Sequence, residues 1–356
     1  MKIAINTQPL KTGHKDRGIG NYTSNLIEAL KSDPNIEITE FTNLSQVKEV
    51  DLIHYPWFDF YFHTLPINKP YPAIVTIHDV IPLKFKDHYP FGLRARFNLG
   101  LQKLALSGSK QIITDSNVSK KDIIDLLRVR PDKISVVYLA LGEDFKVLSS
   151  TEQLLVKRKY RLPNRYLLYV GDANWTKNLP FLIESFNQLI KEGGLSDLKL
   201  VLVGGVFLKK VENIDHPELE SLKLVNRLIE KYALAEKVIR PGNIDTKDLV
   251  AFYNLATIYL QPSIYEGFGL PIIEAMACGV PVVCSEGGSL PEVGGQAPVY
   301  FNPGRSKQLL SIIREILDSH SLQNKLSELG LKRAKEFSKE KFASEIKKIY
   351  SKVINQ

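Results

Sequence analysis

Cysteines, long apolar runs and blocks of like charge are all scarce in this 356-residue chain, and each absence narrows the possible classes of protein. Cysteine occurs only at Cys278 and Cys284, without CxxC spacing, which argues against a disulfide framework and against a structural zinc site. The apolar run at residues 198–208 is too short to span a bilayer. The first residues, MKIAINTQPL, lack the apolar core of a signal peptide, so we expect a cytoplasmic protein.

The charge balance is basic, with 47 Lys and Arg against 39 Asp and Glu, a net charge of +8 at pH 7. This excess can simply keep a surface soluble, or it can attract nucleotide phosphates and an anionic membrane. There is no long Lys/Arg block and no RNA-binding signature, so nucleic acid is not an expected partner. The length and the 44% of hydrophobic residues suit a globular protein of two domains.

The most informative pattern lies at residues 261–285, QPSIYEGFGLPIIEAMACGVPVVCS. It predicts the end of a strand, a loop with Glu266, a helix stopped by Gly279 and a second apolar strand. We place Glu274 in the first turn of this helix, where the helix dipole favours its charge. Both carboxylates then lie at the carboxyl end of a strand, where ligands bind in α/β sheets. A well-capped helix with one solvated glutamate is the alternative.

The complete string, with seven residues between Glu266 and Glu274, closely resembles the Glu-x7-Glu region of retaining family 4 glycosyltransferases. The resemblance implies the GT-B architecture, an α/β fold of two Rossmann-like domains with parallel sheets facing across a cleft. It also implies that Glu274 holds ribose hydroxyls of a nucleotide sugar and that Glu266 faces the donor sugar. The N–H groups around Phe268, Gly269 and Leu270 would bind sugar hydroxyls or phosphate.

The amino-terminal half carries two further motifs, RGIGNYTSNLIEAL at 17–30 and TIHDVIPL at 76–83. A strand at 2–6, a loop with Gly18 and Gly20 and a helix from residue 21 can cradle a phosphate, or form only a tight turn. The same resemblance implies that this loop lies near the donor diphosphate and the acceptor. A lone histidine at a strand end is more often structural, but the resemblance gives His78 a contact with the donor sugar. We interpret His54 and His88 as structural.

A strand at 166–170 leads into the loop GDANWTKN, which opens a helix. A single lysine there can be ordinary solvated surface, or it can bind a phosphate. The resemblance puts Lys177 at the lysine position of the family's phosphate-binding segment. Asp172 stands where many members carry an arginine. We expect Asp172 to hydrogen-bond loop N–H groups. Lys177 is expected to neutralise the diphosphate, joined by Arg17 or another cation across the cleft.

The segment 91–105, FGLRARFNLGLQKLA, is predicted to be helical, basic and apolar. It is either a surface helix packed on its sheet or an interfacial helix that contacts lipid headgroups. Nearby, Ser116 ends a strand and is expected to cap the helix that follows.

We predict two domains, residues 1–150 and 151–339, with a linker near 143–165. The resemblance implies that a last helix at about 340–356 crosses back to the first domain. In the second half, helical segments alternate with strands near 166–170, 199–204, 237–240, 257–261, 281–284 and 298–301. This alternation favours a parallel sheet covered by helices.

Our hypothesis from the sequence is a retaining glycosyltransferase that moves a sugar from a nucleotide-sugar donor to a glycan or lipid-linked acceptor in polysaccharide assembly. The resemblance makes GDP-mannose the first candidate donor, and a peripheral position on the inner membrane face is part of the hypothesis. The chain has no Asp-x-Asp triplet, so we expect no metal, and no cofactor. One alternative is a GT-B nucleotide-sugar epimerase. The other is a non-catalytic sugar-nucleotide-binding subunit, and its only support is Asp172 at the position where many members carry an arginine.

Overall fold

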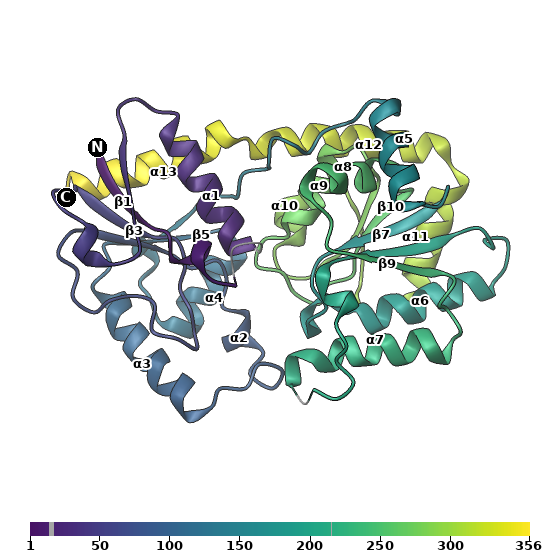
Figure 1. The fold of residues 1–356 in the computed structure, drawn as a ribbon, viewed down its shortest axis with the longest axis horizontal. Helices are drawn as coiled ribbons and strands as arrows, with labels where there is room; N and C mark the ends of the chain where they lie inside the picture. Colours follow the sequence, from purple (N-terminus) through teal and green to yellow (C-terminus); the bar gives the residue numbers. More distant parts are fainter. Residues whose placement is uncertain (14–17, 215) are drawn as a thin grey trace. The chain divides into compact units, whose positions relative to one another are not determined.

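The computed structural model describes residues 1–13, 18–214 and 216–356, drawn in Figure 1. The chain forms two compact units. Unit 1 comprises residues 1–140 and 337–356, and unit 2 comprises residues 141–336. The sequence analysis placed the corresponding boundaries after residues 150 and 339.

Unit 1 is built on a six-stranded parallel sheet with the strand order β2-β1-β3-β4-β5-β6. The three strands β3, β4 and β5 are buried along their whole length, as expected for apolar runs covered on both faces. The sequence analysis missed β2, an edge strand whose polar residues are partly exposed. The bounds are β1 Lys2–Asn6, β2 Glu37–Phe41, β3 Leu52–Tyr55, β4 Ala73–Thr76, β5 Gln111–Thr114 and β6 Ile134–Val136.

Helices cover both faces of this sheet. One apolar cluster joins α1 and α13 to it, and a second cluster on the other face joins α3 and α4. The last helix, α13, therefore belongs to the core of unit 1 although it ends the chain. The helices are α1 Gly18–Lys31, α2 Ile81–Lys84, α3 Leu93–Ser107, α4 Asn117–Leu127 and α13 Lys339–Ile354, with 3-10 turns at Gln8–Lys11, Leu44–Gln46 and Pro131–Lys133.

Unit 2 contains a second six-stranded parallel sheet, in the order β12-β11-β10-β7-β8-β9. All six strands that the sequence predicted for this half are present. The chain starts the sheet at β7, builds outward to β9, and then returns to the other side of β7 with β10. The bounds are β7 Tyr166–Val170, β8 Lys199–Val203, β9 Val238–Gly242, β10 Ile258–Gln261, β11 Val282–Ser285 and β12 Val299–Phe301.

The helices of unit 2 also lie on both faces of its sheet. A large apolar cluster packs α6, α7 and α11 on one face, and α8 packs on the other through Tyr253 against Tyr259 of β10. The helices are α5 Ser150–Tyr160, α6 Leu179–Lys191, α7 Glu220–Lys231, α8 Thr246–Leu255, α9 Leu270–Ala277, α10 Leu290–Gly294, α11 Ser306–Asp318 and α12 His320–Ala334. The 3-10 turns are Trp175–Lys177, Gly205–Leu208, Pro217–Leu219 and Lys335–Phe337.

The predicted irregular linker at 143–165 is wrong for about half of its length, because Ser150–Tyr160 forms α5. A capping box between Ser149 and Glu152 starts this helix. Tyr160 then fixes it to α8, where its hydroxyl donates to Asp248 at 2.9 Å. The helix buries no residue completely, so it gave no apolar periodicity to detect.

Among the described residues, no helix combines the length and the apolar content that are needed to cross a bilayer.

Candidate functional site

The predicted carboxylates and lysine of unit 2 gather where the order of its sheet reverses, between β7 and β10. The loop after β7 carries Lys177, and the loop after β10 carries Glu266. Because both strands are parallel, their carboxyl ends meet at one edge of the sheet. In open α/β sheets this edge, at the point of reversal, is where ligands bind.

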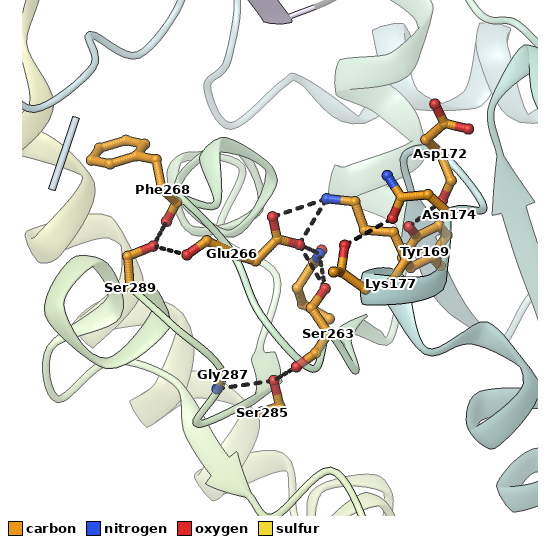
Figure 2. Close-up of polar contacts among 12 residues, drawn as sticks. Tyr169, Asp172, Asn174, Lys177, Ser263, Glu266, Phe268, Ser285, Gly287 and Ser289 are labelled. Atoms are coloured by element: carbon orange, nitrogen blue, oxygen red, sulfur yellow. Dashed lines mark hydrogen bonds and ion pairs between the residues drawn. The ribbon is translucent and has the colours of Figure 1, made fainter. Parts of the chain in front are cut away.

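Glu266 is buried, with 6% of its surface exposed, and it is held by donors from three residues (Figure 2). The Lys177 ammonium donates to Oε1 at 2.8 Å and to Oε2 at 2.9 Å. Gln261 Nε2 and Ser263 Oγ also donate to Oε1, at 2.7 and 2.6 Å. Oε1 therefore accepts from Lys177, Gln261 and Ser263, which fixes the carboxylate. Among the described residues, Oε2 accepts a hydrogen bond only from Lys177.

The backbone of the Glu266 loop is fixed by the glycine loop that follows β11. Ser289 donates through its N–H to the Glu266 carbonyl at 3.1 Å and through Oγ to the Phe268 carbonyl at 2.8 Å. Gly288 has φ +63°, and a Cβ there would lie 2.3 Å from the Glu266 carbonyl oxygen. Only glycine permits this approach, so the two loops form one rigid assembly.

Helix α9 begins at Leu270, after Gly269 in the left-handed conformation at φ +95°. The positive φ favours glycine here, and a Cβ on Gly269 would also lie 2.6 Å from a methyl group of Leu290, which would have to move. Glu274 is the fifth residue of α9, and no acidic residue lies in the first turn. The prediction that Glu274 lies in the first turn is therefore wrong by less than one turn, because the helix starts before Pro271.

The Glu274 carboxylate accepts a hydrogen bond from the buried Tyr253 hydroxyl of α8 at 2.8 Å. Burial raises the pKa of Glu274 to about 7, and the bond from Tyr253 opposes this only in part. Glu274 therefore changes between an acceptor-only carboxylate and a neutral carboxyl group near neutral pH.

Asp172 turns away from the Lys177–Glu266 pair (Figure 2). Its Oδ1 accepts from the Ala173 N–H at 2.8 Å, and its carbonyl accepts from the Tyr169 hydroxyl at 2.6 Å. This is the expected bonding of Asp172 to a loop N–H group. The side chain therefore shapes the turn, and Lys177 is the cation that this loop brings to the site.

In unit 1, His78 follows β4, and its Nδ1 lies 2.8 Å from Asp115 Oδ2 at the end of β5. Tyr22 of α1 contacts the imidazole edge-on, with ring centroids 4.6 Å apart. Burial favours the neutral imidazole, but the Asp115 carboxylate, together with Asp79 and the Pro56 carbonyl, holds the pKa of His78 above its ordinary value. The other carboxylate oxygen of Asp115 is buried without a hydrogen-bond partner in the described residues.

Gly18 and Gly20 form the first turn of α1, where the sequence analysis expected a loop that ends before residue 21. Arg17, named with this loop, lies outside the described residues. His54 is fully buried, and its ring nitrogens lie 2.5 Å from the Tyr350 hydroxyl and 2.8 Å from Thr76 Oγ1. Burial, and then the charge of His78, lowers the pKa of His54 to about 3, so His54 is a neutral structural residue.

Ser116 caps α4 by accepting from the Ser119 N–H at 3.0 Å, as predicted.

Two family models match the chain. Residues 152–333 match the model of glycosyl transferases group 1, and residues 35–141 match that of glycosyltransferase family 4. The chain belongs to the group 1 glycosyl transferases. The family membership predicted from the sequence is therefore confirmed, and the matched regions include Lys177, Glu266 and His78.

Curated relatives of this glycosyl transferase include mannosyltransferases. It is 32% identical to O-antigen chain mannosyltransferase B of Escherichia coli, over 75% of this chain and 66% of the relative. It is 30% identical to the serotype-specific mannosyltransferase WbdA of Escherichia coli, over 79% of this chain but only 33% of the relative. The chain thus matches from a third to just under two-thirds of the length of these relatives.

Solved structures confirm the predicted GT-B fold of this glycosyl transferase. Sucrose-phosphate synthase from Thermosynechococcus elongatus superimposes with a TM-score of 0.74 at 19% identity, covering 100% of this chain and 99% of that one. HepE from Anabaena, in complex with UDP and glucose, gives a TM-score of 0.74 at 18% identity and covers 99% of both chains.

The sequence analysis did not identify several polar residues that contact the site residues of this transferase, namely Tyr253, Gln261, Ser263, Ser289 and Asp115. Gln261 and Ser263 lie just beyond the apolar part of a strand, and Asp115 directly precedes the predicted cap, so their position at strand ends was the available signal. Tyr253 gave no signal, because a tyrosine on an apolar helix face usually belongs to the core.

Proposed function

We propose that this chain is a retaining glycosyltransferase that moves a mannosyl group from GDP-mannose to a glycan or lipid-linked acceptor in polysaccharide assembly. The observation that carries the proposal is the Lys177–Glu266 pair at the point of sheet reversal, with Glu274 following after seven intervening residues. The mannosyltransferase activity named for the relatives from Escherichia coli supports the choice of sugar.

The reaction breaks the bond between the anomeric carbon and the diphosphate, which leaves with the electron pair as GDP. The acceptor oxygen forms the new bond to that carbon and loses its proton. The main electrostatic demand is the negative charge that grows on the diphosphate. Lys177 meets this demand, because an ammonium group has three donors and Glu266 engages two of them.

The remaining residues bind and orient the donor in this proposal. Glu274 accepts hydrogen bonds from the ribose hydroxyls, and Glu266 presents Oε2 to the sugar. The loop from Phe268 to Leu270 contributes backbone N–H groups. The resemblance of TIHDVIPL supports a role for His78 in orienting the sugar, and the resemblance of RGIGNYT supports a role for Gly18 and Gly20 in phosphate binding.

Turnover by the purified chain tests the proposal. Incubation with GDP-mannose and an oligomannose acceptor is expected to give free GDP and an extended acceptor whose new linkage keeps the α configuration by NMR. A changed sugar nucleotide would instead identify an epimerase, and donor binding without turnover would identify a non-catalytic subunit. Thermal-shift measurements with UDP-, GDP- and dTDP-sugars identify the base, because a bound ligand raises the melting temperature.

We also propose that the protein works peripherally on the inner membrane face, where a lipid-linked acceptor would be presented. The positive net charge supports this location, since an anionic leaflet attracts basic proteins.

Replacement of Glu274 by alanine is expected to weaken GDP-mannose binding by about 10- to 100-fold. Loss of a charged acceptor costs roughly 1.5–3 kcal/mol, which corresponds to that range of affinity. Tyr253→Phe is the matched control, because it removes the bond between the two side chains but keeps the carboxylate. Calorimetry measures both affinities. An affinity unchanged in Glu274→Ala would contradict the ribose-binding role.

The affinity for GDP-mannose is expected to fall by roughly tenfold from pH 8 to pH 6, because ribose binding requires the ionised form of a group with pKa about 7. Burial raises the pKa values of the neighbouring Tyr253, Tyr259 and Cys278, so these groups stay neutral in this range. Calorimetry of Glu274→Gln should give a flat profile. Any part of the pH dependence that comes from His78 should disappear in His78→Gln. A pH dependence that persists in Glu274→Gln would show that another group titrates.

A further inference from the structure

Helix α3 lies on the outside of unit 1 (Figure 1). It exposes a stripe of large apolar side chains. Leu93 is 85% exposed, Phe97 is 68% exposed and Leu104 is 57% exposed. Their spacing of four and seven residues puts them on one side of the helix. Core packing does not account for this stripe, because the buried residues of α3 lie on the opposite side, at Gln102, Ala105 and Leu106.

The exposed stripe sits on a well-anchored helix. Gln102 donates to the Asp59 carbonyl and accepts from the Leu65 N–H, each at 2.9 Å. These bonds fix α3 to the loop between β3 and β4. The same loop carries two further exposed apolar side chains, Phe62 at 61% and Ile67 at 48%. The apolar surface is therefore a fixed feature of the fold, and such a surface marks a site of interaction.

A basic groove of about 480 Å³ runs beside the stripe. Its cations are Lys86, Arg96 and Lys103, and Asp87 is the one acidic residue in its lining. None of the three cations forms an ion pair with any residue that the structure describes. Arg96 Nε donates to the Phe91 carbonyl at 3.2 Å, which orients the guanidinium group. The other lining residues are Leu83, Pro90, Phe91, Leu99 and Leu126.

We propose that this face docks on an anionic phospholipid bilayer. The stripe of Leu93, Phe97 and Leu104 enters the boundary of the acyl chains, and the groove receives a lipid phosphate between Lys86, Arg96 and Lys103. Charge complementarity selects this occupant, because Arg96 and Lys103 flank one side of the stripe and Arg94 flanks the other. This proposal identifies the surface that would hold the protein at the membrane in the proposed peripheral location. It does not depend on which donor the protein uses.

Flotation of the full chain with vesicles tests the proposal. We expect binding to phosphatidylcholine vesicles that contain phosphatidylglycerol, and little binding to phosphatidylcholine alone. The triple variant Lys86→Gln, Arg96→Gln, Lys103→Gln should reduce binding by roughly 100-fold, since each cation near an anionic bilayer contributes about fivefold. A control with the same change in net charge carries the substitutions Lys307→Gln, Lys325→Gln and Lys332→Gln in exposed positions of unit 2, and it should keep most of the binding.

The apolar part of the surface has its own pair of variants. Leu93→Ser with Phe97→Ser should abolish flotation, while Leu154→Ser with Leu155→Ser, at exposed positions on α5, should leave it intact. Equal losses in the groove variant and its control would reduce the effect to net charge and overturn the proposal. Saturable binding of inorganic phosphate without vesicle binding would also overturn it. A monomer–dimer equilibrium that the stripe variant abolishes would assign the face to a second copy.

Calorimetric binding of GDP-mannose to the same variants separates this proposal from the proposed function. Normal donor binding with lost flotation supports the docking surface. Flotation with the expected variant effects, but without any donor binding or turnover, would leave the docking surface in place and contradict only the function.

Discussion

Lys177→Ala is expected to lower sugar transfer by roughly 100-fold or more, because it removes the cation that stabilises the charge on the leaving diphosphate. The variant also leaves Glu266 buried with only Gln261 and Ser263 as donors, which costs stability as well. Lys177→Arg keeps the charge and should retain more activity. Transfer rates are therefore compared below the melting temperature of each variant.

Asp172→Asn is the matched control within the same loop. The amide oxygen can still accept from the Ala173 N–H, so most of the activity should remain. An active Lys177→Ala, or an inactive but well-folded Asp172→Asn, would reverse the roles that we assign to these two residues.

Gly288→Ala is expected to abolish measurable transfer and to lower the melting temperature. The new Cβ would lie 2.3 Å from the carbonyl oxygen and 2.7 Å from the nitrogen of Glu266, both of which are backbone atoms that a rotamer change cannot move. The left-handed conformation at φ +63° adds roughly 1–2 kcal/mol for any residue with a Cβ. The Glu266 loop must shift, and the carboxylate moves with it.

Gly304→Ala provides the comparison for this prediction. It lies in the loop before α11, and its Cβ would meet nothing closer than 3.5 Å, so stability and transfer should change little. Calorimetric melting and initial rates measure both variants. Normal kinetics in Gly288→Ala would show that the position of the Glu266 backbone does not matter for the reaction.

The amino-acid sequence by itself determined the class of fold and the location of the candidate site. Fully buried parallel strands are mostly apolar runs, and the runs at 52–55, 73–77 and 111–114 indicate the centre of the first sheet without tertiary information. The spacing of Glu266 and Glu274 around a glycine loop is also local, so the sequence showed it directly. By contrast, β2 and α5 bury too little apolar surface to leave a pattern.

Only the tertiary structure decided which groups meet. Lys177 and Glu266 are 89 residues apart, and their ion pair exists because β7 and β10 are neighbours at the point of sheet reversal. The pKa of Glu274 depends on burial against Tyr253 of another helix, which no local pattern specifies. The spacing of Leu93, Phe97 and Leu104 defines one side of a helix, but whether that side is covered depends on what the rest of the chain packs against it.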